Sequence, residues 1–318
     1  MPSGSKDSLS EAARSLYTRV AFYYHRRGLT QGEIAQNLQI SRQRVNRILS
    51  ACLDLGIVQI RINSEDSNFL ELEAWLEQQY NLNAVRIAAG VTPENIYTEV
   101  GLHAGRYLAE VVRDGDIIGF SRGRTLSGMV SHMPAINHRD LVAVQLMGGW
   151  NKRQDNVSGD DIVRDFSEKA PVARTVMLYA PVLLRDKNLH DTIVNEPYFT
   201  EAYKVIKSCN IAVLGIGRVG KDALLPAVYE SDNDFRLPDG AVGEVCAQFY
   251  DIHGQPVVGE INEHIITIQY EDLMNIPLRI GVAGQVSKLP AILGAVRGGY
   301  VNVLVTDAET ALAMKQTD

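Results

Sequence analysis

Apolar residues recur at helical spacing through the first 56 residues, and polar residues with capping chemistry separate the runs. The first run predicts a helix over residues 9–27, which Gly28 ends. Thr30 and Glu33 then have the spacing of a capping box, in which each side chain satisfies a backbone N–H group at a helix start. A short second helix is therefore expected over residues 31–38.

A third helix follows after a tight turn. Ser41 provides its N-terminal cap, and Gly56 ends it after about residue 55. Two short helices joined by such a turn are a helix-turn-helix. The turn holds Gln39 where glycine is common, so a left-handed backbone there should cost on the order of 1 kcal/mol. The inward positions are apolar or small: Ile34, Ala35, Leu38, Ile40, Val45, Ile48 and Leu49.

Residues 57–63 have the pattern of a strand that closes this N-terminal part. A polar hinge then leads into a predicted amphipathic helix. Such a helix packs either on the rest of its own chain or on the same helix of a second subunit, and the pattern favours neither. Its apolar positions are Phe69, Leu72, Trp75, Leu76 and Tyr80.

From residue 83 onward, short apolar runs alternate with helical stretches. This alternation is typical of a doubly wound α/β domain, a largely parallel sheet with helices on both faces. We expect a helix-turn-helix domain over residues 1–62, a hinge and linker helix over 63–82, and the α/β domain over 83–318. The expected strands are residues 84–88, 116–120, 141–147, 176–182, 210–216, 245–251, 278–283 and 301–305.

Length and composition agree with two domains. A chain of 318 residues, 46% of them hydrophobic, is long enough to build substantial cores. No apolar stretch approaches the roughly 20 residues that span a bilayer, and no signal peptide is evident, so we expect a cytoplasmic protein without membrane contact. Cys52, Cys209 and Cys246 lie far apart, which predicts buried thiols rather than disulfides or a zinc site.

Charge divides the chain unevenly. Residues 1–63 contain nine Lys and Arg against four Asp and Glu, a net +5, and since the whole chain carries −7 the remainder carries −12. A basic head on an acidic body indicates that the head alone binds a nucleic acid. A solvated surface without a partner is the alternative that charge alone leaves open.

The exposed face of the third helix favours the nucleic-acid interpretation, because its side chains can donate to base edges or neutralise phosphates. We expect Gln43, Arg44 and Arg47 to contact bases. Gln31 and Arg42 are expected to hold phosphates, beside the cap Ser41. An ordinary charged helix is the alternative. The face consists of Arg42, Gln43, Arg44, Asn46 and Arg47.

Three predicted strand ends carry residues suited to an anion. Gly148 and Gly149 follow one strand, where backbone could approach a ligand closely. Lys288 stands at a Pro-marked helix start and could pair with a phosphate. The alternatives are a plain glycine turn, a solvated lysine and an arginine-bearing surface turn. The third end follows the strand at 116–120, where the N–H groups of a helix start and a cationic side chain converge on one point. Its residues are Ser121, Gly123, Arg124 and Thr125.

The segment "NIAVLGIGRVGK" at 210–221 raises a different possibility. Gly215, Gly217 and Gly220 have the spacing of a dinucleotide fingerprint, which would make the chain an NAD(P)-dependent oxidoreductase. That site needs its glycine loop to open a helix. Here Pro226 and polar turn residues follow instead, so nicotinamide binding is the minor alternative.

Together these blocks resemble bacterial transcriptional regulators of the SorC type, which include deoxyribonucleoside and autoinducer-uptake regulators. The resemblance runs from "LTQGEIAQNLQISRQRVNRIL" through "GDIIGFSRGRT", "VAVQLMGG", "IAVLGIG" and "AVGEVCAQFYDIHG" to "AGQVSKLPAILGAVRGGYVNVLVTD". It implies a reader of double-stranded operator DNA and an effector domain similar to sugar-phosphate isomerases and deaminases. It also implies a homodimer or homotetramer that responds to a phosphorylated sugar or polyol.

Carried over to this chain, the resemblance assigns a role to each of several residues. Gly215 and Gly217 form a turn that approaches the ligand. Glu244 stands where relatives usually have aspartate, and would accept hydrogen bonds from sugar hydroxyls. Met147 cannot form an imine, so we expect reversible, non-covalent binding. The phosphate cradle would consist of Ser121, Gly123, Arg124 and Thr125, with Lys288 as its cationic partner.

A sugar-phosphate isomerase or deaminase is the enzymatic alternative. Such chemistry needs a base beside the substrate carbons and usually a ring-opening histidine. Of the seven histidines, only His253 lies near the inferred loops, in a segment typical of a turn. We therefore expect a regulator of a carbohydrate or polyol catabolic operon that is not an enzyme and holds neither cofactor nor metal.

Overall fold

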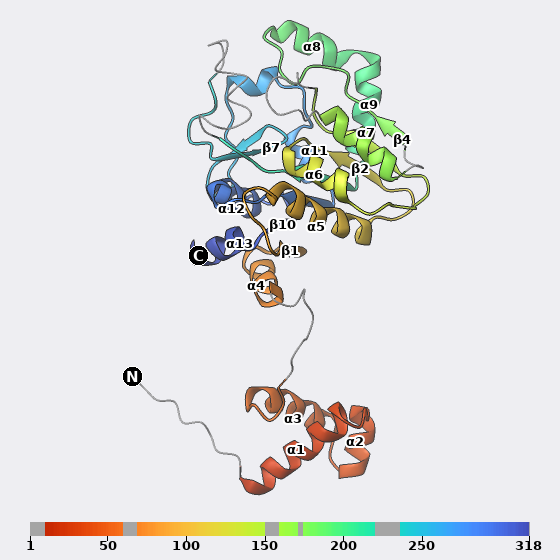
Figure 1. Ribbon diagram of the computed structural model, residues 1–318, viewed down its shortest axis with the longest axis vertical. Helices are drawn as coiled ribbons and strands as arrows, with labels where there is room; N and C mark the ends of the chain where they lie inside the picture. The colour runs from red at the N-terminus through yellow and green to blue at the C-terminus, as the bar shows by residue number, and fades with distance from the viewer. Residues whose placement is uncertain (1–9, 60–68, 150–158, 171–173, 220–235, 318) are drawn as a thin grey trace. The chain divides into compact units, whose positions relative to one another are not determined.

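The computed structural model describes residues 10–59, 69–149, 159–170, 174–219 and 236–317. The chain divides into two compact units, Met1–Ser67 and Asn68–Asp318 (Figure 1). A helix-turn-helix is followed by an α/β unit with a parallel sheet, which confirms the predicted fold class.

The N-terminal unit consists of α1 (Glu11–His25), α2 (Gln31–Leu38) and α3 (Arg42–Asp54). The capping box at the start of α2 is present, because Glu33 N donates to Thr30 Oγ1 at 3.3 Å and Thr30 N donates to the Glu33 carboxylate at 2.8 Å. The three helices enclose one apolar core around Val20, Ile34, Val45, Ile48 and Cys52.

Two details of this unit bear on the predictions. Gln39 adopts the left-handed conformation expected of it, with φ 52°. The strand predicted over 57–63 is wrong for residues 57–59, because 57 and 58 form a bend and 59 has no regular structure, and the rest of it lies outside the described residues. Gly56, at φ 68°, turns the chain back so that Val58 N donates to Cys52 O, and this closes the helix end instead of starting a strand.

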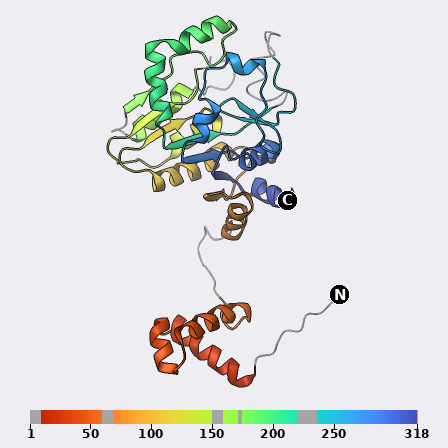
Figure 2. The same ribbon diagram turned by 180° about the vertical axis from the view of Figure 1, so that it is seen from behind.

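A parallel sheet of seven strands runs through the larger unit (Figures 1 and 2). Six of the eight predicted strands lie in this sheet, and those at 176–182 and 245–251 differ from the prediction. In spatial order the strands are β1 (Ala84–Ala88), β10 (Val303–Asp307), β9 (Leu278–Val282), β5 (Ile211–Gly215), β2 (Ile117–Phe120), β3 (Val142–Gln145) and β4 (Arg174–Val176).

Helices cover both faces of this sheet, and each face has its own apolar core. One core receives side chains from α5 (Ile96–Val111), α6 (Arg124–His132) and α7 (Gly159–Lys169). The opposite core receives them from α4 (Leu70–Tyr80), α9 (Pro197–Lys207), α11 (Tyr270–Met274), α12 (Leu289–Arg297) and α13 (Ala308–Thr317). Helix α8 (Lys187–Asn195) contacts this core only with partly buried side chains.

The helix α4 packs on its own chain, which answers the question that its apolar stripe left open. Leu72 and Leu76 are buried in the core of the larger unit. Glu73 and Glu77 accept hydrogen bonds from the backbone N–H groups of Ile87 and Val85, each at 2.8 Å. Since β1 is an edge strand, these carboxylates satisfy donors that would otherwise be open to another chain.

The strand predicted at 245–251 is wrong in one respect, because it contains a hairpin turn. Strands β7 (Gly243–Val245) and β8 (Gln248–Tyr250) pair with each other, and β7 also pairs with β6 (Gly217–Arg218). Cys246 and Ala247 form the turn with φ 51° and 57°. Neither residue is a usual choice for a left-handed turn, so the sequence hid it.

The predicted strand at 176–182 is also displaced. Strand β4 ends at Val176, and the chain beyond it makes only isolated bridges, such as Gly149 with Pro181. Pro181 has no N–H group to donate to a ladder, which limits pairing there. All three cysteines are buried and unpaired, as predicted. Among the helices of the described residues, none combines the length and the apolar character that crossing a membrane requires.

Helices α5 and α6 approach each other so closely that only glycine fits at their contact. A Cβ atom at Gly128 would lie 2.2 Å from Tyr97 O, and one at Gly101 would lie 2.5 Å from Met129 N. Both neighbours are backbone atoms that cannot rotate away.

Gly128→Ala should therefore lower the free energy of unfolding by about 1–3 kcal/mol, the usual effect of overpacking. Urea denaturation of the full chain measures this. Ser127→Ala, one position earlier on α6, is the matched control and should leave the midpoint nearly unchanged. Equal midpoints for the two variants would contradict the close crossing.

Candidate functional site

The order of the strands creates a crevice between β2 and β5. The chain leaves β2 for β3 on one side, whereas β5 pairs with β9 on the other. Such a switch point is where open α/β sheets bind ligands, outside the carboxyl ends of the strands. A pocket enclosing about 110 Å³ lies there, which exceeds the roughly 10–15 Å³ that one water needs.

Most of the predicted effector residues line this one pocket, although they come from loops after β2 and β5, from β7 and from the start of α12. The predicted residues in its wall are Ser121, Gly123, Arg124, Thr125, Gly215, Gly217, Glu244 and Lys288. Gly148 and Gly149 are not in the wall. Glycine at 148 serves a close chain contact instead, because a Cβ atom there would lie 2.7 Å from Ala180 O.

The beginning of α6 faces the pocket. Gly123 is its N-cap with φ 145°, a conformation that favours glycine, and no side chain caps the first turn. The first N–H groups of a helix without a side-chain cap favour an anion, because they need acceptors and lie at the positive end of the helix dipole. Arg124 begins the helix with its guanidinium 4.6 Å from the centre of the Tyr97 ring.

Hydrogen bonds and close contacts tie the two loops of the pocket together. Ser121 is buried, and its Oγ accepts a hydrogen bond from Gly215 N at 2.8 Å. A Cβ atom at Gly215 would lie 2.7 Å from Arg122 O, and one at Gly217 would lie 2.0 Å from Glu244 Oε1. Glycine at 215 and 217 thus lets β5 and β6 approach the neighbouring loop and carboxylate.

The Glu244 carboxylate is held by the strained turn that follows it. Its Oε2 accepts a hydrogen bond from Ala247 N at 2.8 Å. Burial raises the pKa of Glu244, which the hydrogen bond from Ala247 and the charges of Arg122 and Lys288 partly oppose. A carboxyl group in this position can accept hydrogen bonds from hydroxyl groups.

Lys288 is partly withdrawn from water. Burial lowers its pKa to about 8, the positive charges of Arg124 and Arg218 act in the same direction, and Glu244 opposes them. Its Nζ donates to Ile216 O at 3.3 Å. An anion in the pocket would favour the charged form of this amine.

Sequence reasoning missed several lining residues. Arg122 and Arg218 add two positive charges to those of Arg124 and Lys288, so the pocket has four cations and, among the described residues, one carboxylate. Arg122 lay inside the predicted loop, and its charge was a visible hint. Arg218 follows the glycine turn, and only the pairing of β6 with β7 brings it to the pocket.

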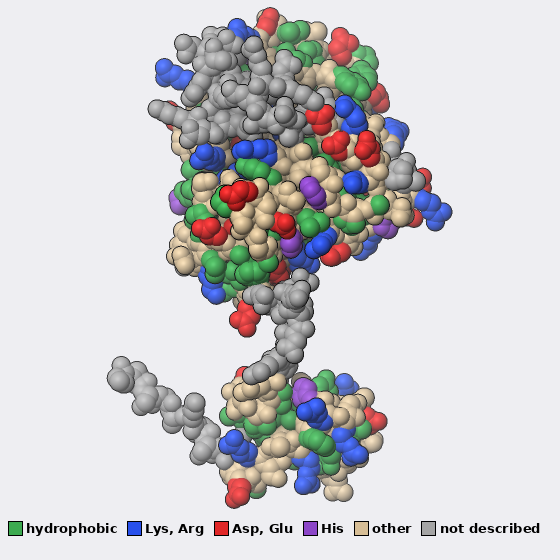
Figure 3. Space-filling model, viewed as in Figure 1, with side chains coloured by type: hydrophobic (Ala, Val, Ile, Leu, Met, Phe, Trp, Pro, Cys, Tyr) green, Lys and Arg blue, Asp and Glu red, His purple; other side chains and the backbone are tan. Residues whose placement is uncertain are grey.

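The predicted DNA-contacting residues lie on the outer face of α3. Arg42, Gln43, Arg44, Asn46 and Arg47 are all exposed, while Val45, Ile48 and Leu49 are buried. Figure 3 shows blue Lys and Arg side chains gathered on this unit. Ser41 Oγ accepts from Arg44 N at 3.1 Å, which confirms it as the cap. Gln31 Nε2 lies 3.4 Å from Asn46 Oδ1, which joins the start of α2 to α3.

The glycine segment 215–220 does not build a dinucleotide site in the part that the structure describes. Gly217 and Arg218 form β6, an antiparallel neighbour of β7, so the chain continues as a strand where the fingerprint needs a helix. Gly220 and Pro226 lie outside the described residues.

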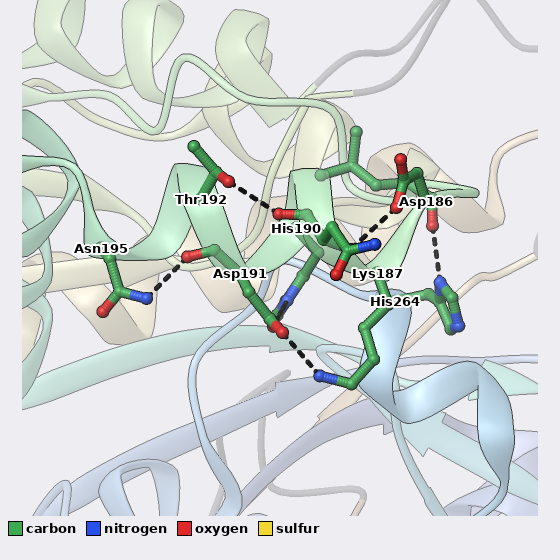
Figure 4. Close-up of polar contacts among 9 residues, drawn as sticks. Asp186, Lys187, His190, Asp191, Thr192, Asn195 and His264 are labelled. Carbon is green, nitrogen blue, oxygen red and sulfur yellow. Dashed lines mark hydrogen bonds and ion pairs between the residues drawn. The ribbon is translucent and has the colours of Figure 1, made fainter.

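A further group of polar side chains, outside the pocket, surrounds α8 (Figure 4). Asp191 accepts from Lys187 at 2.8 Å and lies 3.0 Å from His190 Nδ1, and His264 Nδ1 lies 2.9 Å from Leu184 O. The first two contacts lie within α8, and the third joins His264 to the chain just before that helix. Within the described residues no group of His, Cys, Asp and Glu could hold a metal ion.

Comparison with known families gives two matches that divide the chain as the fold does. Residues 64–314 match the family described as "Putative sugar-binding domain". Residues 8–54 match region 4 of sigma-70.

Characterised relatives match almost end to end. The chain is 29% identical to the deoxyribonucleoside regulator of Bacillus subtilis over 307 residues, which are 95% of this chain and 97% of that one. It is 30% identical to the sorbitol operon regulator of Klebsiella pneumoniae over 302 residues, 93% of this chain and 96% of that one. These relatives are regulators of transcription and not enzymes, as predicted for this chain.

Solved structures agree. The full-length sorbitol operon regulator SorC of Klebsiella pneumoniae superposes with a TM-score of 0.73 at 29% identity, and covers 96% of this chain and 99% of its own. A transcriptional regulator from Streptococcus pneumoniae superposes with a TM-score of 0.70 at 27% identity, over 80% of this chain and 99% of its own.

The lowered pKa of Lys288 gives a prediction about stability. The pKa of Lys288 is about 8 in the folded chain and 10.5 in the unfolded one. At a pH between these two values the unfolded chain binds more protons than the folded one, so the free energy of unfolding rises with pH there. Below this range, the folded chain carries a charged and partly desolvated amine. Lys288→Met should therefore be more stable than the unaltered protein at about pH 7, and this advantage should shrink at about pH 9.5.

Urea denaturation at the two pH values measures the difference. Lys187→Met is the control, because its hydrogen bond to Asp191 raises the pKa of Lys187, so removing that amine brings no gain at neutral pH. A Lys288→Met advantage that is absent at neutral pH, or that grows with pH, would refute this account of the pocket.

Proposed function

The chain belongs to the SorC-type family of sugar-binding transcriptional regulators, and from that premise we propose that a phosphorylated sugar or polyol, bound in the pocket between β2 and β5, sets its affinity for operator DNA. The regulated genes would serve the catabolism of that carbohydrate or polyol. Such a regulator works beside DNA in the cytoplasm. Two of its relatives are named a sorbitol operon regulator and a deoxyribonucleoside regulator. These names support a polyol or a pentose as the type of effector.

One observation carries the proposal: the uncapped start of α6 and four cationic side chains converge on one small pocket. The unit around it is acidic, with a net charge of −12 over residues 64–318. Arg124 and Lys288 stand beside the uncapped start of α6, a combination that favours an anion. Phosphate fits, because helix N–H groups and arginine are suited to its oxygens.

The rest of the pocket suits the carbon skeleton of the effector. Glu244 supplies the acceptor for hydroxyl groups, held in place by Ala247 N. Met147 contributes an apolar wall without a nucleophile. The neutral amine of Lys288 could attack an aldehyde. Because Lys288 lies in the same pocket as Arg124, we expect it to pair with the phosphate instead. Binding is therefore proposed to be reversible and non-covalent.

On the DNA side, α3 is proposed to lie in the major groove. Gln43, Arg44 and Arg47 would read bases, while Gln31 and Arg42 hold phosphates. One small reader covers few base pairs, so two or four copies would bind repeated half-sites. The effector would act by binding the DNA-competent and incompetent arrangements unequally, and a typical coupling of about 1–3 kcal/mol changes operator affinity about 5- to 150-fold.

The first test removes the phosphate cradle. The double variant Arg124→Ala, Thr125→Ala should bind effector about tenfold to hundredfold more weakly, because hydrogen bonds to charged groups contribute about 1.5–3 kcal/mol. Calorimetry with inorganic phosphate, a pentose 5-phosphate and a hexitol 6-phosphate measures the loss on the full chain. Arg106→Ala, an exposed arginine on α5, is the control. Unchanged affinity in the double variant would overturn the assignment of the cradle.

The second test concerns base reading. If the Arg47 guanidinium contacts a base edge, Arg47→Ala should weaken the binding free energy by about 1–3 kcal/mol and relax the preference at one base position. Duplexes selected from a random pool by the full chain give the preferred site, and single base changes in that site locate the loss. Arg19→Ala on α1 removes the same charge from an exposed position and should keep the base preference. Uniform weakening on all sequences would reassign Arg47 to a phosphate.

A further inference from the structure

The wall of the pocket that holds Lys288 is fixed by a buried carboxylate that touches no predicted ligand position. Asp307 ends β10 and is only 3% exposed. Its Oδ2 accepts a hydrogen bond from Gln285 N at 2.8 Å. Gln285 is in the pocket wall, and Lys288 N donates to Gln285 O at 2.9 Å, so one turn joins Asp307 to Lys288.

Gln285 needs this support, because its φ of 84° is one that residues with a side chain rarely adopt. Backbone strain of this kind persists where the surroundings hold it, and it is common at ligand sites. The preceding Gly284 leaves the room, since a Cβ atom there would lie 2.6 Å from Asp307 Oδ2. The carboxylate and the strained turn are thus in direct contact.

The same carboxylate also begins α13. Thr310 N donates to Asp307 Oδ1 at 2.9 Å, and Thr310 Oγ1 donates to Oδ2 at 2.7 Å. The Thr310 hydroxyl therefore shares Oδ2 with Gln285 N. A shift of the Gln285 turn would change the hydrogen bonds that hold the first turn of α13.

Helix α13 in turn packs on α4, which is the first helix of the larger unit after the N-terminal helix-turn-helix unit. Ala311 and Met314 of α13 share one core with Leu72 and Leu76 of α4. At its other end the Lys315 ammonium lies 5.4 Å from the centre of the Trp75 ring.

We propose that Asp307 is a positioning residue that couples the Lys288 side of the effector pocket to α13 and, through it, to α4. The inference rests on the proposed function of the pocket. Binding of a phosphate at Lys288 would move the Gln285 turn, change its hydrogen bond to Asp307, and shift α13 against α4. Coupling of this kind requires an element whose state both sites bias, and α13 is that element.

The chain offers its own reporter for this coupling. Its two tryptophans are Trp75 and Trp150, so Trp150→Phe leaves Trp75 on α4 as the single emitter. In that background, titration with inorganic phosphate and with a hexitol 6-phosphate should change Trp75 emission with the same midpoint as the heat measured by calorimetry.

Asp307→Asn should keep the heat of binding, at reduced affinity, and lose most of the Trp75 change at saturation. An amide offers one acceptor oxygen and presents N–H donors to the remaining backbone N–H group. Thr310→Val, which keeps the shape and removes one bond to Asp307, is the milder variant if Asp307→Asn does not fold. Asp191→Asn on α8 (Figure 4) replaces a hydrogen-bonded carboxylate away from the pocket and should behave like the parent.

The outcomes separate the two proposals. Binding heat without any change of Trp75 emission in the parent would overturn the coupling and leave the pocket assignment intact. A full Trp75 change in both Asp307→Asn and Thr310→Val would overturn the role of Asp307. Absence of binding heat with every phosphate compound would overturn the proposed function and this inference with it.

Discussion

The parallel pairing of β2 with β5 is the constraint on which the pocket depends. Because the chain leaves these strands toward opposite edges of the sheet, no connection crosses the space between their carboxyl ends. Three kinds of positive group then meet there without any contact in sequence: the first N–H groups of α6, the arginines of two loops, and the lysine that precedes α12. The hydrogen bond from Gly215 N to Ser121 Oγ closes the base of the crevice and fixes the spacing of the loops.

The groups around this crevice are not the ones that stability alone would favour. Cys246, Ala247 and Gln285 hold left-handed conformations, and such backbone strain costs of order 1–3 kcal/mol for each residue. Lys288 loses part of its hydration beside other cations. Two of these departures have a local support: Thr267 Oγ1 donates to Cys246 O in the hairpin, and Asp307 Oδ2 accepts from Gln285 N in the turn. Concentrating such departures at one pocket is typical of a site kept for binding.

Local chemistry explains where the sequence could predict the structure. The capping box at Thr30 and Glu33 and the cap at Ser41 define both short helices, since each cap needs only neighbours in the chain. The strand after residue 243 could not be predicted correctly, because Cys246 and Ala247 give no sign of a turn. Arg218 reaches the pocket, and Asp307 the turn behind its wall, only through pairing of distant strands. Gly148 resembled a ligand contact and proved to serve the chain's own backbone, a distinction that spacing alone cannot make.

The separation of charge along the chain suits the proposed binding of DNA phosphates by one unit and of a phosphorylated effector by the other. The cations of α3 stand on an exposed face, where a duplex can reach them. Those of the pocket line a space of about 110 Å³ inside a unit of net charge −12, which repels a polyanion at distance. A small phosphorylated molecule can enter that space, whereas a duplex cannot. Under the proposed function, size and net charge, more than the chemistry of the phosphate group, would therefore decide which site each ligand occupies.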